Sequence, residues 1–177
     1  MNIYIMRHGQ TDWNINHKVQ GLTDIPLNST GIAQAQEAFE KLKNIHFDYV
    51  YCSPLTRTKQ TAALVTGNKY PIIVDPLLIE RDFGDLEGVD FWVYDMSDFW
   101  DRPLDKSFNN EETVMHMLYR AQKFVDKLPK AENILIVTHG AFYRALRAVL
   151  TDVDVTKVNL YDFKLNNCEF FKVERNS

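Results

Sequence analysis

Short apolar runs alternate with amphipathic stretches along the whole chain. Four runs, at residues 3–6, 49–52, 72–74 and 134–137, are rich in β-forming side chains and contain no charged residue. Such runs are typical of strands that are buried on both faces of a parallel sheet. Two more extended segments are expected near residues 159–163 and 168–173, where they would complete the sheet.

The stretches between these runs carry apolar residues at spacings of three and four, which predicts amphipathic helices. The first helix is indicated by Ile32, Ala35, Phe39 and Leu42, with Asn28 as its N-cap. Two later helices are predicted at residues 112–128, closed by a proline, and from about 140 to 150.

A further helix is predicted directly after the second strand. Ser53 is a suitable N-cap, Pro54 suits the first helical position, and Gly67 ends the helix after about residue 65. Strands and helices therefore alternate, which predicts an α/β fold. We expect a three-layer sandwich: a mainly parallel central sheet with helices on both faces, forming a single domain over residues 1–177.

Residues 88–110 differ from the rest of the chain and are interpreted as an inserted, partly helical cap over the edge of the sheet. The segment is dense in aromatic and acidic residues: Phe91, Trp92, Tyr94, Phe99, Trp100 and Phe108, with Asp90, Asp95, Asp98, Asp101 and Asp105. The aromatic rings could face a substrate, the core or a second subunit, and the sequence leaves these alternatives open.

Composition narrows the function classes. Twenty basic and twenty-four acidic residues give a net charge of −4, which argues against nucleic acid or an anionic membrane as partner. No apolar run approaches the roughly 20 residues that span a bilayer, and no signal-peptide pattern precedes the first strand. Cys52 and Cys168 have no metal-type spacing. We expect two buried thiols and a cytoplasmic protein.

Candidate chemistry gathers where two predicted strands end. Arg7-His8-Gly9 follows the first strand and Thr138-His139-Gly140 follows the fourth. In open α/β sheets, ligands bind beyond the carboxyl ends of the strands, and the N-terminus of a helix attracts anions. Arg57, in the first turn of its helix, opposes the helix dipole and is easier to explain beside an anion. Two arginines, two histidines and a helix N-terminus indicate a phosphoryl pocket.

The chain resembles the histidine phosphatase superfamily, which includes cofactor-dependent phosphoglycerate mutases and many small phosphatases. The similar stretches follow the family's order over nearly the whole chain: residues 7–14, residues 20–21 with 24–27, Ser53-Pro54-Leu55 with Arg57, Gln60, Thr61 and Ala62, residues 80–84 with Glu87-Gly88, and residues 138–140. The resemblance implies a phosphoglycerate mutase-like fold and an activity that passes through a phosphohistidine.

The resemblance also implies roles for individual residues. His8 corresponds to the nucleophile, and Glu80 to the general acid, with Glu87 and Asp82 as alternatives. The phosphoryl oxygens would be held by Arg7, Arg57 and His139. We assign substrate binding to Asn14, Thr11, Gln20, Gly21 and Gly140. His17, His46 and His116 are expected to be surface or helix residues without a role.

A phosphomonoester hydrolase is favoured over a mutase. The family's mutases are longer, carry a lysine near the position of Phe91, and have paired arginines where this chain has only Arg102. We therefore expect a small-molecule phosphomonoester with an apolar or aromatic body and a single phosphate. A mutase-type phosphotransferase and a catalytically silent binding member of the fold are the alternatives.

We expect no metal and no cofactor. His8, His139 and Glu80 could form a two-histidine, one-carboxylate metal site, but two arginines aimed at a divalent cation would be costly. Neither the substrate nor the oligomeric state follows from the sequence, and a homodimer is one possible assembly.

Overall fold

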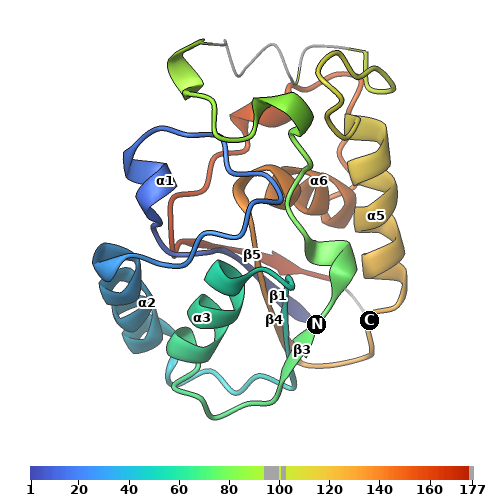
Figure 1. Ribbon diagram of the computed structural model, residues 1–177. Coiled ribbons are helices and arrows are strands. Elements are labelled where there is room, and N and C mark those ends of the chain that lie inside the picture. Colours follow the sequence, from blue (N-terminus) through green and yellow to red (C-terminus); the bar gives the residue numbers. More distant parts are fainter. Residues whose placement is uncertain (94–99, 101–102, 176–177) are drawn as a thin grey trace.

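Five strands form one sheet in the computed structural model, and Figure 1 shows it at the centre of the molecule. They are β1 (Asn2–Arg7), β2 (Tyr49–Cys52), β3 (Ile72–Val74), β4 (Asn133–Thr138) and β5 (Phe170–Glu174), arranged in the order β3-β2-β4-β1-β5. All pairs are parallel except β1 with β5, which is antiparallel. The predicted mainly parallel sheet is confirmed, and β3, expected as a short strand, forms its exposed edge.

Helices cover both faces of the sheet (Figure 1). One face packs against α2 (Ser29–Leu42) and α3 (Thr56–Val65), and the other against α5 (Val114–Asp126) and α6 (Gly140–Leu150). Because successive side chains of a strand point to opposite faces, Ile3 and Ile5 join the α5–α6 core, while Tyr4 and Met6 join the α2–α3 core. The three-layer sandwich is confirmed.

Short helical pieces connect these elements on the side where the strands end. They are α1 (Asp12–Ile15) and the 3₁₀ turns Pro76–Leu78, Gly84–Leu86, Phe91–Val93 and Leu160–Asp162. The last of these corrects the extended segment predicted at residues 159–163. The Asn159 side chain accepts the backbone N–H of Tyr161 at 2.8 Å, and this local cap closes a turn instead of a strand.

The start of α3 also differs from the prediction. The helix begins at Thr56, two residues after Pro54, and its N-cap residue Leu55 has no side-chain cap. Instead, the carboxylate of Asp24 accepts the backbone N–H and the hydroxyl of Thr56, both at 2.7 Å. A residue from a distant loop thus caps this helix, and Ser53 is left for another contact. The predicted Asn28 cap of α2 is confirmed, because Asn28 accepts the N–H of Gly31 at 2.8 Å.

The structure describes residues 1–93, 100 and 103–175. Eight residues of the predicted cap, 94–99, Asp101 and Arg102, lie outside the described residues, and with them the singled-out Tyr94, Asp95, Asp98 and Phe99. Within the described ranges, no helix has the length and apolar character needed to cross a membrane. Cys52 and Cys168 are both buried and free, as expected.

Candidate active site

The two His-Gly steps meet at one edge of the sheet. β1 and β4 are parallel neighbours in a register that pairs Arg7 with Thr138, so His8 and His139 leave the sheet side by side. The backbone N–H of His8 donates to the carbonyl of Thr138 at 3.0 Å. The two imidazole rings are both buried, and their centroids lie 5.3 Å apart. The predicted juxtaposition is therefore present in the fold.

The His8 ring is held in the tautomer that a nucleophile needs. Its Nδ1 lies 2.7 Å from the carbonyl oxygen of Gly9. A carbonyl oxygen can only accept, so we assign the ring proton to Nδ1, which leaves the lone pair on Nε2. Burial, and then the charges of Arg57 and Arg7, hold the pKa of His8 well below its ordinary value. The ring is neutral at physiological pH, as attack on phosphorus requires.

His139 is oriented by a guanidinium on one side and a hydroxyl on the other. Arg57 Nε donates to its Nδ1 at 3.2 Å, and its Nε2 lies 2.7 Å from the hydroxyl of Ser53. The ring proton therefore belongs on Nε2. Burial, with the charge of Arg57 next, holds the pKa of His139 well below its ordinary value. Ser53, predicted to cap α3, thus contacts His139 through its hydroxyl.

The buried guanidinium of Arg57 is fixed by the loop that follows α1. Its two terminal nitrogens donate to the carbonyls of Thr23 and Gly21, each at 2.8 Å. Gly21 has φ of +54°, and a Cβ there would meet the Glu87 carboxylate. Only glycine fits this position, which explains part of the Gln20-Gly21 motif.

Arg7 reaches the same place from the end of β1. Its Nη1 donates to the carbonyl of Leu165 at 3.0 Å, while its buried Nε has no hydrogen-bond partner. A Cβ on Gly140 would lie 3.4 Å from that Nε, so the glycine keeps space beside the guanidinium. Gly140 is also the first residue of α6. An anion bound here would face an arginine and a helix N-terminus together.

The Glu80 carboxylate lies across the start of α6. It accepts the backbone N–H groups of Phe142 at 2.9 Å and Ala141 at 3.2 Å, and it lines the same cavity as His8. Glu87 instead accepts from Leu22 and Thr23, and so braces the loop that holds Arg57. The predicted preference for Glu80 as the acid therefore has a geometric basis.

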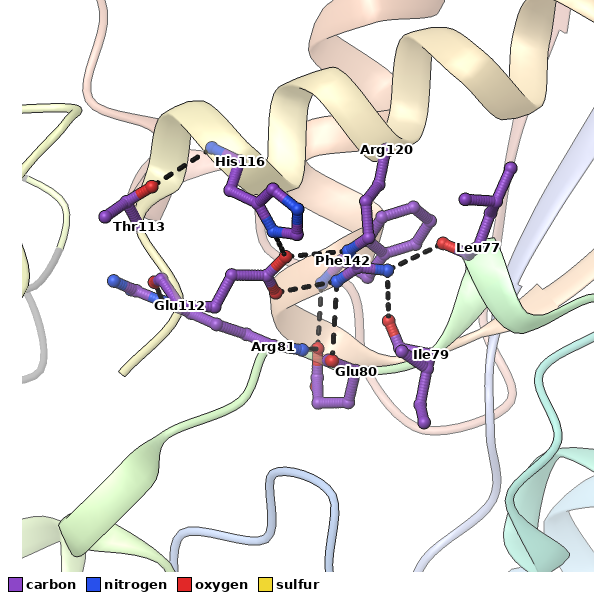
Figure 2. A network of polar contacts seen from close by, with 9 residues as sticks. All are labelled: Leu77, Ile79, Glu80, Arg81, Glu112, Thr113, His116, Arg120 and Phe142. Carbon is purple, nitrogen blue, oxygen red and sulfur yellow. Dashed lines mark hydrogen bonds and ion pairs between the residues drawn. The ribbon is translucent and has the colours of Figure 1, made fainter. Parts of the chain in front are cut away.

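A buried ion pair supports the backbone that leads into Glu80 (Figure 2). Arg120 donates to both carboxylate oxygens of Glu112, at 2.7 Å each. Its guanidinium also donates to the carbonyls of Leu77 and Ile79 and lies 4.4 Å from the centroid of the Phe142 ring. This network, which the sequence analysis did not identify, ties α5 to the Glu80 segment and to α6.

Asn14 and Thr11 form a reciprocal cap on α1. The Thr11 hydroxyl accepts the N–H of Asn14 at 3.3 Å, and the Asn14 side-chain oxygen accepts the N–H of Thr11 at 3.0 Å. This orients the Asn14 amide, which lines the cavity, whereas Thr11 is fully buried and does not line it. Asn167, which the sequence analysis missed, donates to the His8 carbonyl at 2.9 Å.

These groups surround a cavity of about 620 Å³ at the strand ends. Most of the predicted residues line it: Arg7, His8, Asn14, Gln20, Gly21, Arg57, Glu80 and Gly140. Its outer wall is aromatic, and includes Phe91, Trp92 and Trp100 from the predicted cap. His17, expected to have no role, also lines it, with its ring 5.2 Å from Trp92. So do Arg144 and Tyr161, which no sequence motif had indicated.

The charges in the cavity favour an anion. Burial lowers the pKa of Arg7 and of Arg57, which indicates guanidinium groups with little solvation, and the Glu80 carboxylate partly offsets this effect in both. Across the described parts of the chain, no three histidine, cysteine, aspartate or glutamate side chains are grouped as a metal site. A phosphoryl group would meet preorganised donors at this position.

Comparisons with known proteins agree with this geometry. The model of the histidine phosphatase superfamily (branch 1) matches residues 3–177. An uncharacterized phosphatase, PhoE, of Bacillus subtilis (strain 168) is 36% identical over 95% of this chain and 88% of its own length. A 2,3-bisphosphoglycerate-dependent phosphoglycerate mutase of Methylobacterium sp. (strain 4-46) is 34% identical over 84% of this chain and 79% of its own.

The solved structures similar to this chain include an alpha-ribazole phosphatase from Shigella flexneri. It is 27% identical over 99% of this chain and 91% of its own length, with a TM-score of 0.85. The sheet, the paired histidines and the sequence motifs thus lead to one conclusion. The chain belongs to the histidine phosphatase superfamily, branch 1.

Proposed function

We propose that this protein is a phosphomonoester hydrolase that transfers the phosphoryl group to His8 and then to water. The observation that carries the proposal is the hydrogen bond of His8 Nδ1 to the Gly9 carbonyl, which leaves Nε2 as the free nucleophile in the cavity. Arg7, Arg57 and Glu80 line the same cavity. Nucleophile, anion donors and a carboxyl group are therefore assembled together.

The first step forms the phosphoenzyme. His8 Nε2 attacks phosphorus, a P–N bond forms, and the P–O bond to the ester oxygen breaks. The leaving oxygen takes the electron pair of that bond and a proton from Glu80. Arg7 and Arg57 donate to the equatorial oxygens, and their fixed positions mean that little reorganisation is needed as charge develops. His139, whose two ring nitrogens already contact Arg57 and Ser53, positions the Arg57 guanidinium.

The second step returns the enzyme to its starting state. The Glu80 carboxylate takes a proton from water as the water oxygen attacks the phosphohistidine. The P–N bond breaks, its electron pair returns to His8 Nε2, and inorganic phosphate leaves. The two guanidinium groups supply the positive charge that a divalent metal supplies in other phosphatases, so the proposal includes neither metal nor cofactor.

Hydrolysis is favoured over mutase chemistry by the wall of the cavity. Phe91, near the position where the family's mutases carry a lysine, lines the cavity, and so do Trp92 and Trp100. Such a wall suits an apolar or aromatic part of the substrate better than a second phosphate. The proposed substrate is a small-molecule phosphomonoester handled in the cytoplasm, without nucleic acid or membrane as partner. A homodimer is compatible with this proposal.

The deciding experiment follows 3-phosphoglycerate in the presence of catalytic 2,3-bisphosphoglycerate, alongside a panel of phosphomonoesters. We expect phosphate release from the panel and no isomerisation that outpaces phosphate release. Faster isomerisation would establish the mutase alternative, and the absence of turnover with every ester, in folded protein, would favour a silent binding member of the family.

A further inference from the structure

Arg144 is a cation in the cavity wall that the proposed phosphoryl transfer does not use. It lies on α6, and its guanidinium carbon is 4.5 Å from the centroid of the Tyr161 ring and 5.0 Å from that of Trp100. The two rings hold the planar group by cation–π contacts. The position of the guanidinium is therefore fixed before any ligand arrives.

Two nitrogens of this half-buried arginine lack the polar partners that buried guanidinium nitrogens normally have. Its Nε and Nη1 atoms are buried without a hydrogen-bond partner, and within the described part of the chain no carboxylate lies within ion-pair distance of it. Arg147, one turn further along α6, differs in this respect, because its Nη1 donates to the Tyr143 hydroxyl at 3.1 Å. Unpartnered buried donors are rare in folded proteins and usually indicate a ligand or water.

Burial changes the electrostatics of this side chain. It lowers the pKa of Arg144 to about 10, although Tyr161, Glu80 and Asp162 act in the opposite direction. The group is still charged at physiological pH. An anion that entered the cavity would therefore regain for Arg144 the charge-assisted hydrogen bonds that it lacks in the free protein.

Arg144 is well placed relative to the expected phosphate. It lies four residues after Gly140 on α6, which puts the two on one face of the helix, about 6 Å apart along the axis. Helical side chains lean toward the N-terminus, so the Arg144 side chain extends back toward the end that holds Gly140 and His139. The distance between Gly140 and Arg144 along α6 is similar to the distance between two anionic groups on one small molecule.

We propose that Arg144 is a specificity-determining residue that binds a carboxylate on the part of the substrate that leaves with the ester oxygen. The inference rests on the proposed hydrolase function and refines its substrate class, from a monophosphate with a neutral body to a phosphorylated carboxylic acid. A carboxylate is planar and pairs with a guanidinium through two parallel hydrogen bonds.

The test compares two substrates that differ only in this group. 3-Phosphoglycerate and glycerol 3-phosphate share a phosphate and a hydroxyl, and differ by a carboxylate against a hydroxymethyl group. Values of kcat/KM are measured with wild type, Arg144→Met, Arg144→Lys and the control Arg147→Met. We expect the wild type to prefer 3-phosphoglycerate, and Arg144→Met to reduce that preference on the order of 10- to 100-fold, mainly through KM.

Arg144→Lys should keep part of the preference, since it retains the charge without the planar fork, and Arg147→Met should leave the preference unchanged. An equal loss on both substrates in Arg144→Met would overturn the proposal and make Arg144 a structural residue. A preference that survives in Arg144→Met would do the same. A 2,3-bisphosphoglycerate arm separates carboxylate from phosphate: tighter Arg144-dependent binding of the bisphosphate than of 3-phosphoglycerate would identify a second phosphate site instead.

Calorimetry with a His8→Ala background keeps this inference separate from the proposed function. This background binds 3-phosphoglycerate without turning it over. We expect its affinity to fall on adding Arg144→Met, and the affinity for glycerol 3-phosphate to change less. If that difference appears while no hydrolysis is found with wild type, the subsite stands and the hydrolase proposal fails. If hydrolysis occurs and the difference is absent, the subsite fails alone.

Discussion

The Glu80 carboxylate accepts the backbone N–H of Phe142 at 2.9 Å, across the first turn of α6. This bond connects the segment that supplies the proposed acid to the helix that begins directly after His139. The proposed acid and His139 therefore share one rigid support. Loss of this hydrogen bond is expected to impair proton transfer more than it impairs the stability of the fold.

The first prediction concerns Glu80→Gln. The variant cannot donate a proton, so hydrolysis of esters with poor alkoxide leaving groups should fall roughly 10²- to 10⁴-fold. Phosphoenzyme formation from a nitrophenyl phosphate should fall much less, because its leaving group needs no proton. Stopped-flow bursts and steady-state rates on the two ester types provide the measurement, with melting curves to confirm folding.

Glu87→Gln is the matched control for this experiment, since Glu87 braces the Gly21–Thr23 loop and is not among the residues that line the cavity. It should slow both ester types alike. If Glu87→Gln discriminated between them and Glu80→Gln did not, the acid would be Glu87.

The second prediction concerns His8. Rapid acid-free quenching of wild type with labelled substrate should trap one phosphate per chain that is acid-labile and base-stable. His8→Ala should abolish both this label and turnover, while retaining the fold. Peptide mapping decides the assignment, and a label on His139 would contradict it.

The third prediction concerns the buried ion pair in Figure 2. Arg120→Met removes both hydrogen bonds that the guanidinium donates to the buried Glu112 carboxylate and leaves the exposed His116 ring as its side-chain partner, which should cost up to about 3–5 kcal/mol of stability. Adding Glu112→Leu should recover much of that loss, because no unpaired charge remains. In the double variant, however, the carbonyls of Leu77 and Ile79 still lack the Arg120 donor.

If Arg120 positions Glu80, the stable double variant should retain KM but lose more activity on alkyl than on nitrophenyl phosphates. Lys123→Met, on the same helix, serves as control. If the double variant changed activity on both ester types equally, the ion pair would be a purely structural contact.

The fourth prediction concerns the pH dependence of stability. Burial lowers the pKa of both His8 and His139 in the folded chain, whereas unfolded histidines titrate near about 6.5. Unfolding therefore takes up protons below that pH, and the free energy of unfolding should fall as pH falls, by up to about 1.4 kcal/mol per pH unit for each histidine. Above about pH 7 these two residues should contribute no slope.

Urea titrations between about pH 5 and pH 8 measure this effect. His8→Asn should flatten the acid side of the profile, whereas His46→Asn, on an exposed loop residue, should not. An unchanged slope in His8→Asn would mean that the ring is already protonated in the folded state.

The fifth prediction is that activity survives exhaustive chelation. Arg7 and Arg57 provide the charge at the phosphoryl position, and vanadate, which mimics pentavalent phosphorus, should inhibit strongly. If activity were lost in chelator and restored by one particular metal, the prediction would be wrong, and the reaction would need a metal site in addition to the arginines.

Local sequence patterns were sufficient for the elements that depend on local burial and spacing. The four apolar runs became β1 to β4, and the Asn28 cap of α2 formed where its side chain meets Gly31. The pairing of His8 with His139 was also foreseeable, because both follow buried strands and parallel strands end at one edge of a sheet. These features are encoded in short stretches of residues.

Contacts between distant segments decided what local patterns could not indicate. Asp24 caps α3 from a remote loop, and Ser53 is thereby free to contact His139. The positions of Arg144 and Arg120 depend on the packing of α5, α6 and the loops around them. Neither arginine belongs to a motif, since side-chain partners separated by many residues become neighbours only when the chain has folded.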